Sequence, residues 1–128
     1  MTTTVVLWAG VAVVGGIGSV LRFVVDRAVA RRAARAFPFG TLAVNISGAA
    51  LLGFLGGLAL SRDAALLAGT GFVGAYTTFS TWMLETQRLS EERQTWTALA
   101  NIVVSIVLGI AAAVLGQWVA HQFVTGRA

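Results

Sequence analysis

Long stretches without a charged residue alternate with short polar segments along this chain. The charge-free runs cover 1–21, 37–61, 64–84 and 95–120. A helix rises about 1.5 Å per residue, so roughly 20 apolar residues span a hydrocarbon core of about 30 Å. Each run is long enough to cross a bilayer. The pattern therefore predicts an all-α membrane protein with four transmembrane helices in a single domain, 1–128.

The polar segments predict where these helices end. We expect the first span to end near Val25 and to be followed by a loop over 26–38, with Pro38 starting the second span. Only a polar turn over 61–63 separates the second and third spans, which predicts a helical hairpin. A third loop is expected over 86–94. The first run has no basic start and exceeds the usual core of a signal peptide, so we expect it to remain in the mature protein.

Composition supports the membrane interpretation. Hydrophobic residues make up 57% of the 128 residues and charged residues 11%, whereas soluble domains carry about 25% charged residues. The net charge is +4 and all nine basic residues are Arg. Most of them flank the spans, which favours contact with a membrane surface over nucleic-acid binding. The chain has no Cys, so a disulfide framework and a thiolate metal site are excluded.

The arginines also predict an orientation, because short basic loops tend to stay in the cytoplasm. The first and third loops lie on one side of a four-span protein and hold six arginines. The other side holds Arg62, Arg127 and the free amino terminus. We expect the basic loops in the cytoplasm and both termini outside. The six arginines are Arg27, Arg31, Arg32, Arg35, Arg88 and Arg93.

Two of the spans carry polar and small residues every four positions, which places them on one helix face. Taken singly, such Asn and Ser residues are best explained by interhelical hydrogen bonds, worth about 0.6 kcal/mol on average. Their concentration on packing faces, where they offer N–H and O–H donors, favours an anion path. The positions are Asn45, Ala49, Gly53 and Gly57 in the second span and Asn101, Ser105, Gly109 and Ala113 in the fourth.

The third span is the least helical by composition. Glycines at 69, 71 and 74 precede a run of hydroxyl and aromatic residues over 77–82. Glycine and the β-branched hydroxyl residue Thr both weaken a helix. We expect a break at mid-membrane whose carbonyls could hold a cation. The match of 69–74 to the dinucleotide pattern GxGxxG lacks the βαβ context that gives it meaning, so we discard it.

Three further side chains have two interpretations each. Phe79 and Trp82 share a helix face; they either pack or turn a positive ring edge toward an anion. Arg22 either snorkels to the interface or attracts anions into a vestibule. Glu85 is expected to pair with Arg88 at i+3. The five acids lie at span ends or in loops and the single His has no partner, so no enzyme site is predicted.

The chain resembles the Fluc (CrcB) family of fluoride channels over essentially its whole length. Four ordered pieces carry the resemblance: GGIGSVLRF over 15–23, FGTLAVN over 39–45, GFVGAYTTFSTW over 71–82, and the Asn101/Ser105 face. The resemblance implies an antiparallel, dual-topology dimer with two narrow fluoride pathways and a structural sodium ion at the dimer centre.

Residue roles follow from the resemblance by position. Asn45 resembles the pore asparagine, and Phe79 the first of two paired phenylalanines, with Trp82 standing where the family usually has the second. Gly74 and Thr77 resemble the backbone carbonyl ligands of sodium. Ser105 and Asn101 fall on what resembles the polar track of the fourth span, and the Thr78 and Ser80 hydroxyls are expected to assist.

Together with the apolar spans, the resemblance implies a passive fluoride exporter in a prokaryotic plasma membrane, surrounded by lipid, that lowers the toxicity of cytoplasmic fluoride. Three alternatives remain open: a proton-coupled small multidrug-type exporter, a non-transporting accessory protein, and a non-conducting subunit of a heterodimeric channel. The first needs a membrane-embedded Glu in the first span, which has no acid before Asp26. The arginine bias favours one orientation, so the partner is either a second copy or an oppositely oriented paralogue.

Overall fold

A computed structural model describes residues 1–126, and Arg127 lies outside this range. The described chain is helical, without β-strands. Its elements, in chain order, are α1 (Thr2–Arg32), α2 (Phe39–Gly57), α3 (Arg62–Ala65), the π-helix η1 (Leu66–Val73), α4 (Gly74–Tyr76), α5 (Ser80–Glu91) and α6 (Thr95–Thr125).

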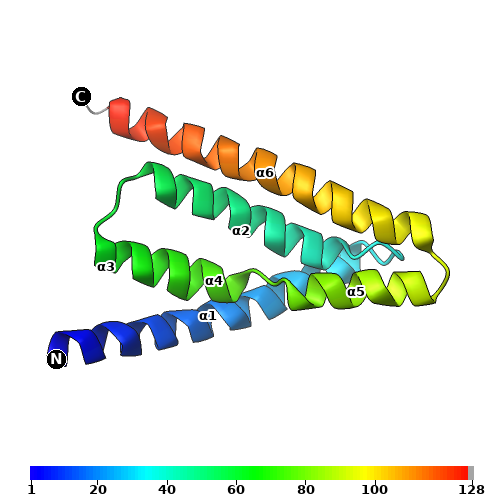
Figure 1. The fold of residues 1–128 in the computed structure, drawn as a ribbon, viewed down its shortest axis with the longest axis horizontal. Coiled ribbons are helices and arrows are strands. Elements are labelled where there is room, and N and C mark those ends of the chain that lie inside the picture. The colour runs from blue at the N-terminus through cyan, green and yellow to red at the C-terminus, as the bar shows by residue number, and fades with distance from the viewer. Residues whose placement is uncertain (127–128) are drawn as a thin grey trace.

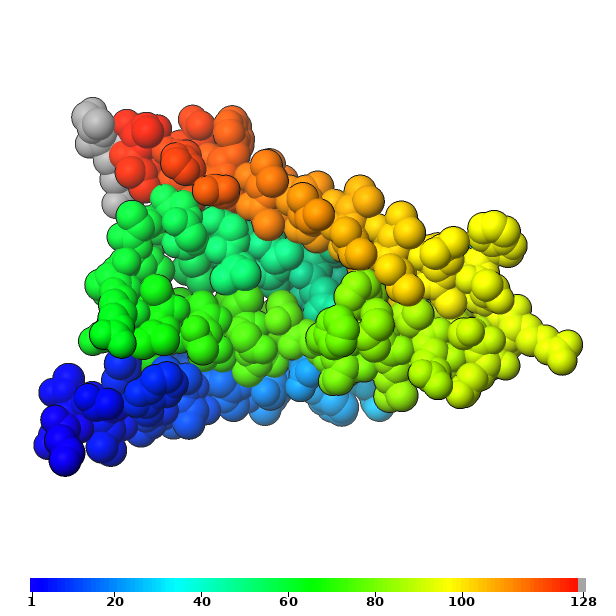
Figure 2. Space-filling view, viewed as in Figure 1, coloured from blue at the N-terminus to red at the C-terminus, as the bar shows by residue number. Residues whose placement is uncertain are grey.

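The elements form four antiparallel passes along the long axis (Figure 1). α1 and α6 lie at opposite edges, with α2 and the series α3–η1–α4–α5 between them (Figure 2). The start of α1, the end of α6 and the turn between α2 and α3 lie at one end, while the loops before α2 and before α6 lie at the other. The predicted hairpin and the predicted side shared by the two basic loops are thus confirmed.

Within residues 1–126, three helices are long and apolar enough to cross a membrane: α1, α2 and α6. The third charge-free run is not one continuous helix. The helix of this segment starts at α3, where Ser61 accepts a hydrogen bond from Ala64 N–H at 3.3 Å. It widens into η1 and stops at Tyr76. The interruption predicted within this run is therefore present, between α4 and α5.

Two predicted helix ends are wrong. α1 continues beyond Val25 to Arg32, and α5 continues through most of the predicted third loop to Glu91. The prediction equated the end of the apolar run with the end of the helix. Arg is a good helix former, and a cation in the last turn is stabilised by the negative end of the helix dipole. Arg31 and Arg32 occupy that position in α1.

Glycines bring the backbones of α2 and α6 into direct contact. A methyl group added at Gly53 would overlap the Ala113 carbonyl, and one added at Gly116 would overlap the Ala50 carbonyl. At Gly57, it would lie 2.7 Å from Ala120 Cβ. Small residues allow such close approach, which provides van der Waals contact where lipid removes the usual hydrophobic driving force. The predicted packing role of the Gly53 and Gly57 face is confirmed.

A similar contact holds α1 against the irregular third segment. A Cβ atom at Gly18 would lie 2.6 Å from the Phe72 carbonyl oxygen. At Gly71, a Cβ atom would lie 3.4 Å from the Val11 carbonyl oxygen. The π-helix and the residues before the break are thus packed directly against α1.

We predict that Gly53→Ala destabilises the protein whereas Gly56→Ala does not. The added methyl group forces α2 away from α6 at position 53, and such overpacking costs roughly 1–3 kcal/mol. Gly56 has no neighbour within 4 Å of an added Cβ, so it is the matched control. Thermal unfolding in detergent should show a lower midpoint for Gly53→Ala alone; equal midpoints would contradict the close packing.

Candidate functional site

The break after α4 is held by one side chain of α2. Asn45 Nδ2 donates to the Thr78 carbonyl oxygen at 2.9 Å, and Thr78 N–H donates to Asn45 Oδ1 at 2.9 Å. The carboxamide thus pairs with the backbone N–H and the backbone carbonyl of Thr78, as a neighbouring β-strand would. Non-helical backbone at membrane depth needs such internal partners. Sequence reasoning placed Asn45 on a path but did not anticipate this clamp.

The carbonyls of Gly74 and Thr77 are among those released from helical hydrogen bonding at the same place. In a continuous helix, Thr78 N–H would bond to the Gly74 carbonyl and Thr81 N–H to the Thr77 carbonyl. Instead, Thr78 N–H bonds to Asn45 Oδ1, and Thr81 N–H bonds to the Thr78 hydroxyl oxygen at 3.1 Å. Gly74 and Thr77 are the two residues predicted as carbonyl ligands.

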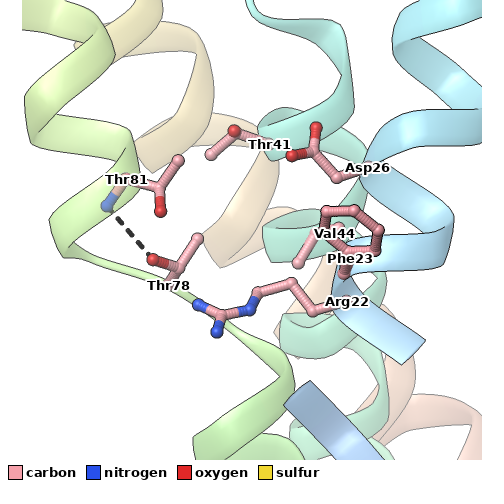
Figure 3. Close-up of a pocket in the computed structure, with 7 residues that line it drawn as sticks. All are labelled: Arg22, Phe23, Asp26, Thr41, Val44, Thr78 and Thr81. Atoms are coloured by element: carbon pink, nitrogen blue, oxygen red, sulfur yellow. Dashed lines mark hydrogen bonds between the residues drawn. The ribbon is translucent and has the colours of Figure 1, made fainter. Parts of the chain in front are cut away.

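The first of three cavities around the break contains the predicted vestibule residue. It has a volume of about 210 Å³ and lies between α1, α2 and α5. The Arg22 side chain extends from α1 toward Thr78 (Figure 3). The Thr78 hydroxyl accepts a bond from Thr81 N–H, which leaves its proton to donate. The lining residues are Arg22, Phe23, Asp26, Thr41, Val44, Thr78 and Thr81.

The other two cavities bring most of the remaining predicted residues together. One, of about 300 Å³, is lined by Asn45, Thr77, Thr78, Phe79 and Trp82 together with apolar residues of α2 and η1. The other, of about 310 Å³, is lined by Asn45, Trp82, Ser105, Ile106, Gly109 and Ile110. Thr78 borders the first two cavities, and Asn45 and Trp82 border the last two.

Phe79, one of the aromatic pair, is exposed, and the Ser105 hydroxyl has no hydrogen-bond partner within the described residues. Phe79 and Trp82 meet edge to face, with ring centroids 5.7 Å apart and planes at 78°, as their expected shared face allows. The Phe79 side chain is 71% exposed on the single chain. Ser105 Oγ is buried without a hydrogen-bond partner within residues 1–126, so its hydroxyl proton is available.

Two predicted path residues lie elsewhere. Asn101 is fully buried, with its Nδ2 donating to Thr86 Oγ1 at 2.9 Å, and it does not line the three cavities. Ser80 opens α5 on the exposed surface and does not line them either. Their part in a path stays a prediction.

Sequence reasoning missed one polar contact beside the Arg22 cavity. The Thr41 hydroxyl donates to the Glu85 carboxylate, which joins α2 to α5. Thr41 is only 2% exposed. The expected Glu85–Arg88 pair is not present as a salt bridge among the described residues, because Glu85 turns toward α2. A signal existed: Thr41 lies one turn before Asn45 on the same helix face.

The comparisons with known proteins agree with one another. Residues 9–117 match the family described as CrcB-like protein, Camphor Resistance (CrcB). The chain is 79% identical over 118 residues to the fluoride-specific ion channel FluC 2 of Mycobacterium tuberculosis, covering 92% of this chain and 94% of that protein. It is 43% identical over 122 residues to the fluoride-specific ion channel FluC 1 of Leifsonia xyli, covering 92% and 88%.

We predict that Asn45→Ala opens the break. The variant leaves Thr78 N–H without its partner, and losing one hydrogen bond of typical strength corresponds to roughly tenfold faster exchange. Hydrogen–deuterium exchange of the segment containing Thr78 measures this. Thr125→Val is the control, because the Thr125 hydroxyl bonds to the His121 carbonyl on the exposed end of α6, away from the break. Unchanged exchange in Asn45→Ala would contradict the clamp.

Proposed function

This chain belongs to the CrcB family of fluoride channels, and we propose that its pathway runs through the three cavities around the break and exports fluoride passively. It is a membrane-embedded channel subunit rather than an enzyme. Its relatives come from bacteria, and we infer that the membrane is the bacterial plasma membrane.

One observation carries the proposed route: successive cavities share lining residues. Thr78 joins the Arg22 cavity to the Phe79 cavity, and Asn45 and Trp82 join that cavity to the Ser105 cavity. An ion that moves through the three cavities in this order passes residues of α1, α2, α5 and finally α6. This supports a path that begins at Arg22 and ends at the Ser105 face of α6.

The chemistry of the lining fits a small anion. Fluoride is strongly hydrated, so a selective pore must replace its water with donors that bind weakly enough to release it. Arg22 carries positive charge, while the hydroxyl protons of Thr78 and Ser105 have no acceptor within residues 1–126. Asn45 has a second amide proton, and the edges of Phe79 and Trp82 are electropositive.

A passive pore is enough for export. An inside-negative membrane potential drives a monovalent anion outward with about 2.3 kcal/mol per 100 mV. This supports a role in lowering cytoplasmic fluoride toxicity. A small multidrug-type exchanger is less well supported, since the first acid of α1 is Asp26 at the end beside the basic loop.

A structural sodium ion fits the freed carbonyls. Gly74 and Thr77 present oxygens whose helical donors bond elsewhere, and unwound carbonyls are the usual sodium ligands in broken membrane helices. Gly74 is exposed on the single chain, which supports a site completed by a second subunit. Bound sodium would supply positive charge that holds the two breaks together.

A second, antiparallel subunit would cover the exposed part of the pathway. Phe79 is 71% exposed, and the cavities at Asn45 lie at the surface of one chain. The basic loops share one end of the fold, so an antiparallel copy must insert against the positive-inside bias. We infer that the partner is a paralogue of opposite orientation, with a homodimer as the alternative.

We predict that the purified chain in liposomes passes fluoride and excludes chloride when a potassium ionophore balances the charge. Asn45→Asp should abolish the fluoride flux, because a carboxylate repels the anion and cannot donate to the Thr78 carbonyl. Thr125→Val, on the exposed end of α6, is the control. An assembled dimer that carries no fluoride would refute the proposed function of the chain alone, and unchanged flux in Asn45→Asp would remove Asn45 from the path.

Orientation can be measured with single cysteines, since the chain has none of its own. We predict that cysteines at Arg32→Cys and Arg62→Cys react with an impermeant thiol reagent from opposite sides of the cell membrane, position 32 from the cytoplasm. Labelling of both positions from both sides would show dual insertion and favour a homodimer.

A further inference from the structure

The basic end of α1 carries an aromatic ring and two arginines on the face that points away from the bundle. Gly18, on the opposite face, packs against the third segment, whereas Phe23, Arg27 and Arg31 are exposed. Residues four apart lie one above another on a helix, about 6 Å along its axis. The three side chains therefore form one outward-facing group, which we call the α1 column.

Arg27 turns back toward the apolar part of α1. Its guanidinium carbon lies 5.5 Å from the centroid of the Phe23 ring, one turn nearer the charge-free run. A long cationic side chain at the end of a span normally extends outward to water. The Arg27 charge is instead held at the level of Phe23, and a guanidinium over a ring still has N–H groups free to donate. This position suits a partner that is itself in the membrane.

The carboxylates at this end of the fold are engaged with other groups. Asp26 points toward α2, where a Cβ atom added at Gly40 would overlap its carboxylate. The three glutamates of this end accept hydrogen bonds from other side chains, in the pairs Thr41–Glu85, Gln87–Glu91 and Gln94–Glu92. An antiparallel copy would bring the opposite end of the fold here, and the acid of that end is Asp63 alone. The counter-charge for the α1 column must therefore come mainly from another kind of molecule.

We propose that the α1 column is a binding site for one phospholipid with a net negative headgroup. The phosphate oxygens accept hydrogen bonds from the Arg27 and Arg31 guanidinium groups, whose planar fork matches phosphate. The net negative charge of the headgroup adds attraction, which amounts to about fivefold in affinity for each arginine near an anionic lipid surface.

The apolar part of the same face favours a lipid over a free phosphate ion. Phe23 is 62% exposed, and Val20 and Val24 beside it are 65% and 53% exposed. An acyl chain attached to the phosphate would lie along these side chains, directly below the arginines. A free phosphate ion would use the guanidinium groups and leave the apolar surface uncovered.

The test follows the thermal unfolding midpoint of the purified, assembled protein in detergent as lipid is added. A ligand that binds only the folded state raises this midpoint. We expect phosphatidylglycerol to raise it, and phosphatidylcholine with the same acyl chains to leave it nearly unchanged. Inorganic phosphate at the same concentration should also have no effect. A shift of equal size with phosphatidylcholine or with inorganic phosphate would overturn the anionic-lipid site.

Three variants locate the site. Arg27→Gln and Arg31→Gln should each raise the phosphatidylglycerol concentration for half of the shift about fivefold. Arg88→Gln is the matched control, because Arg88 is an exposed arginine in the last turn of α5 at the same end of the fold. It should leave that concentration unchanged. Equal effects of all three variants would indicate diffuse attraction and overturn the site.

Native mass spectrometry of the wild-type protein provides a second measurement should a variant fail to assemble. We expect phosphatidylglycerol to remain bound, one per chain, where phosphatidylcholine is lost; equal retention of the two lipids would contradict the site. Dissociation of the dimer by Arg27→Gln would indicate that a second copy covers the α1 column and would also overturn the proposal. Neither measurement depends on ion flux, so the result is independent of the proposed function.

Discussion

The reciprocal hydrogen bonds between the Asn45 carboxamide and the Thr78 backbone are the interaction on which the rest of the site depends. An interrupted helix at membrane depth leaves polar groups that water does not reach, and each unsatisfied group is costly. Asn45 satisfies two of them with one side chain. The same bond diverts the Thr78 N–H from the Gly74 carbonyl, so the clamp both stabilises the break and creates its free oxygen.

The clamp requires close helices, and glycines provide that closeness. A Cβ atom at Gly48, one turn from Asn45, would collide with the Thr77 side chain, so α2 can approach the break only with glycine there. On the other side of the break, Gly18 lets α1 reach the Phe72 carbonyl. Where most soluble proteins fix a loop by burying apolar side chains, this fold brings backbones together and lets one amide reach across.

Sequence predicted the four passes, the interruption and several of the residues that border the three cavities, because each has a local signal. The length of each apolar run indicates the length of a membrane span. The Gly and Thr residues between 69 and 78 indicate a weak helix. The end of α1 at Arg32 was missed because hydropathy marks the membrane boundary rather than the end of hydrogen bonding. The partners of Asn45, Thr41 and Asn101 were missed because they lie 33, 44 and 15 residues away along the chain, and one sequence carries no distance information.

The polar groups near the break divide into those that the fold uses and those that it leaves free. Asn101 Nδ2, the Trp82 N–H and the Thr81 N–H are bonded within the chain. The Thr78 and Ser105 hydroxyl protons are not. An anion needs donors that are not already committed, and it must be kept from the carbonyls that the break exposes. Gly74 is exposed on the single chain, while Thr78 borders two of the cavities and Thr77 borders one of them. Carbonyl acceptors suited to a cation and a hydroxyl donor suited to an anion thus lie within five residues of one backbone, from Gly74 to Thr78.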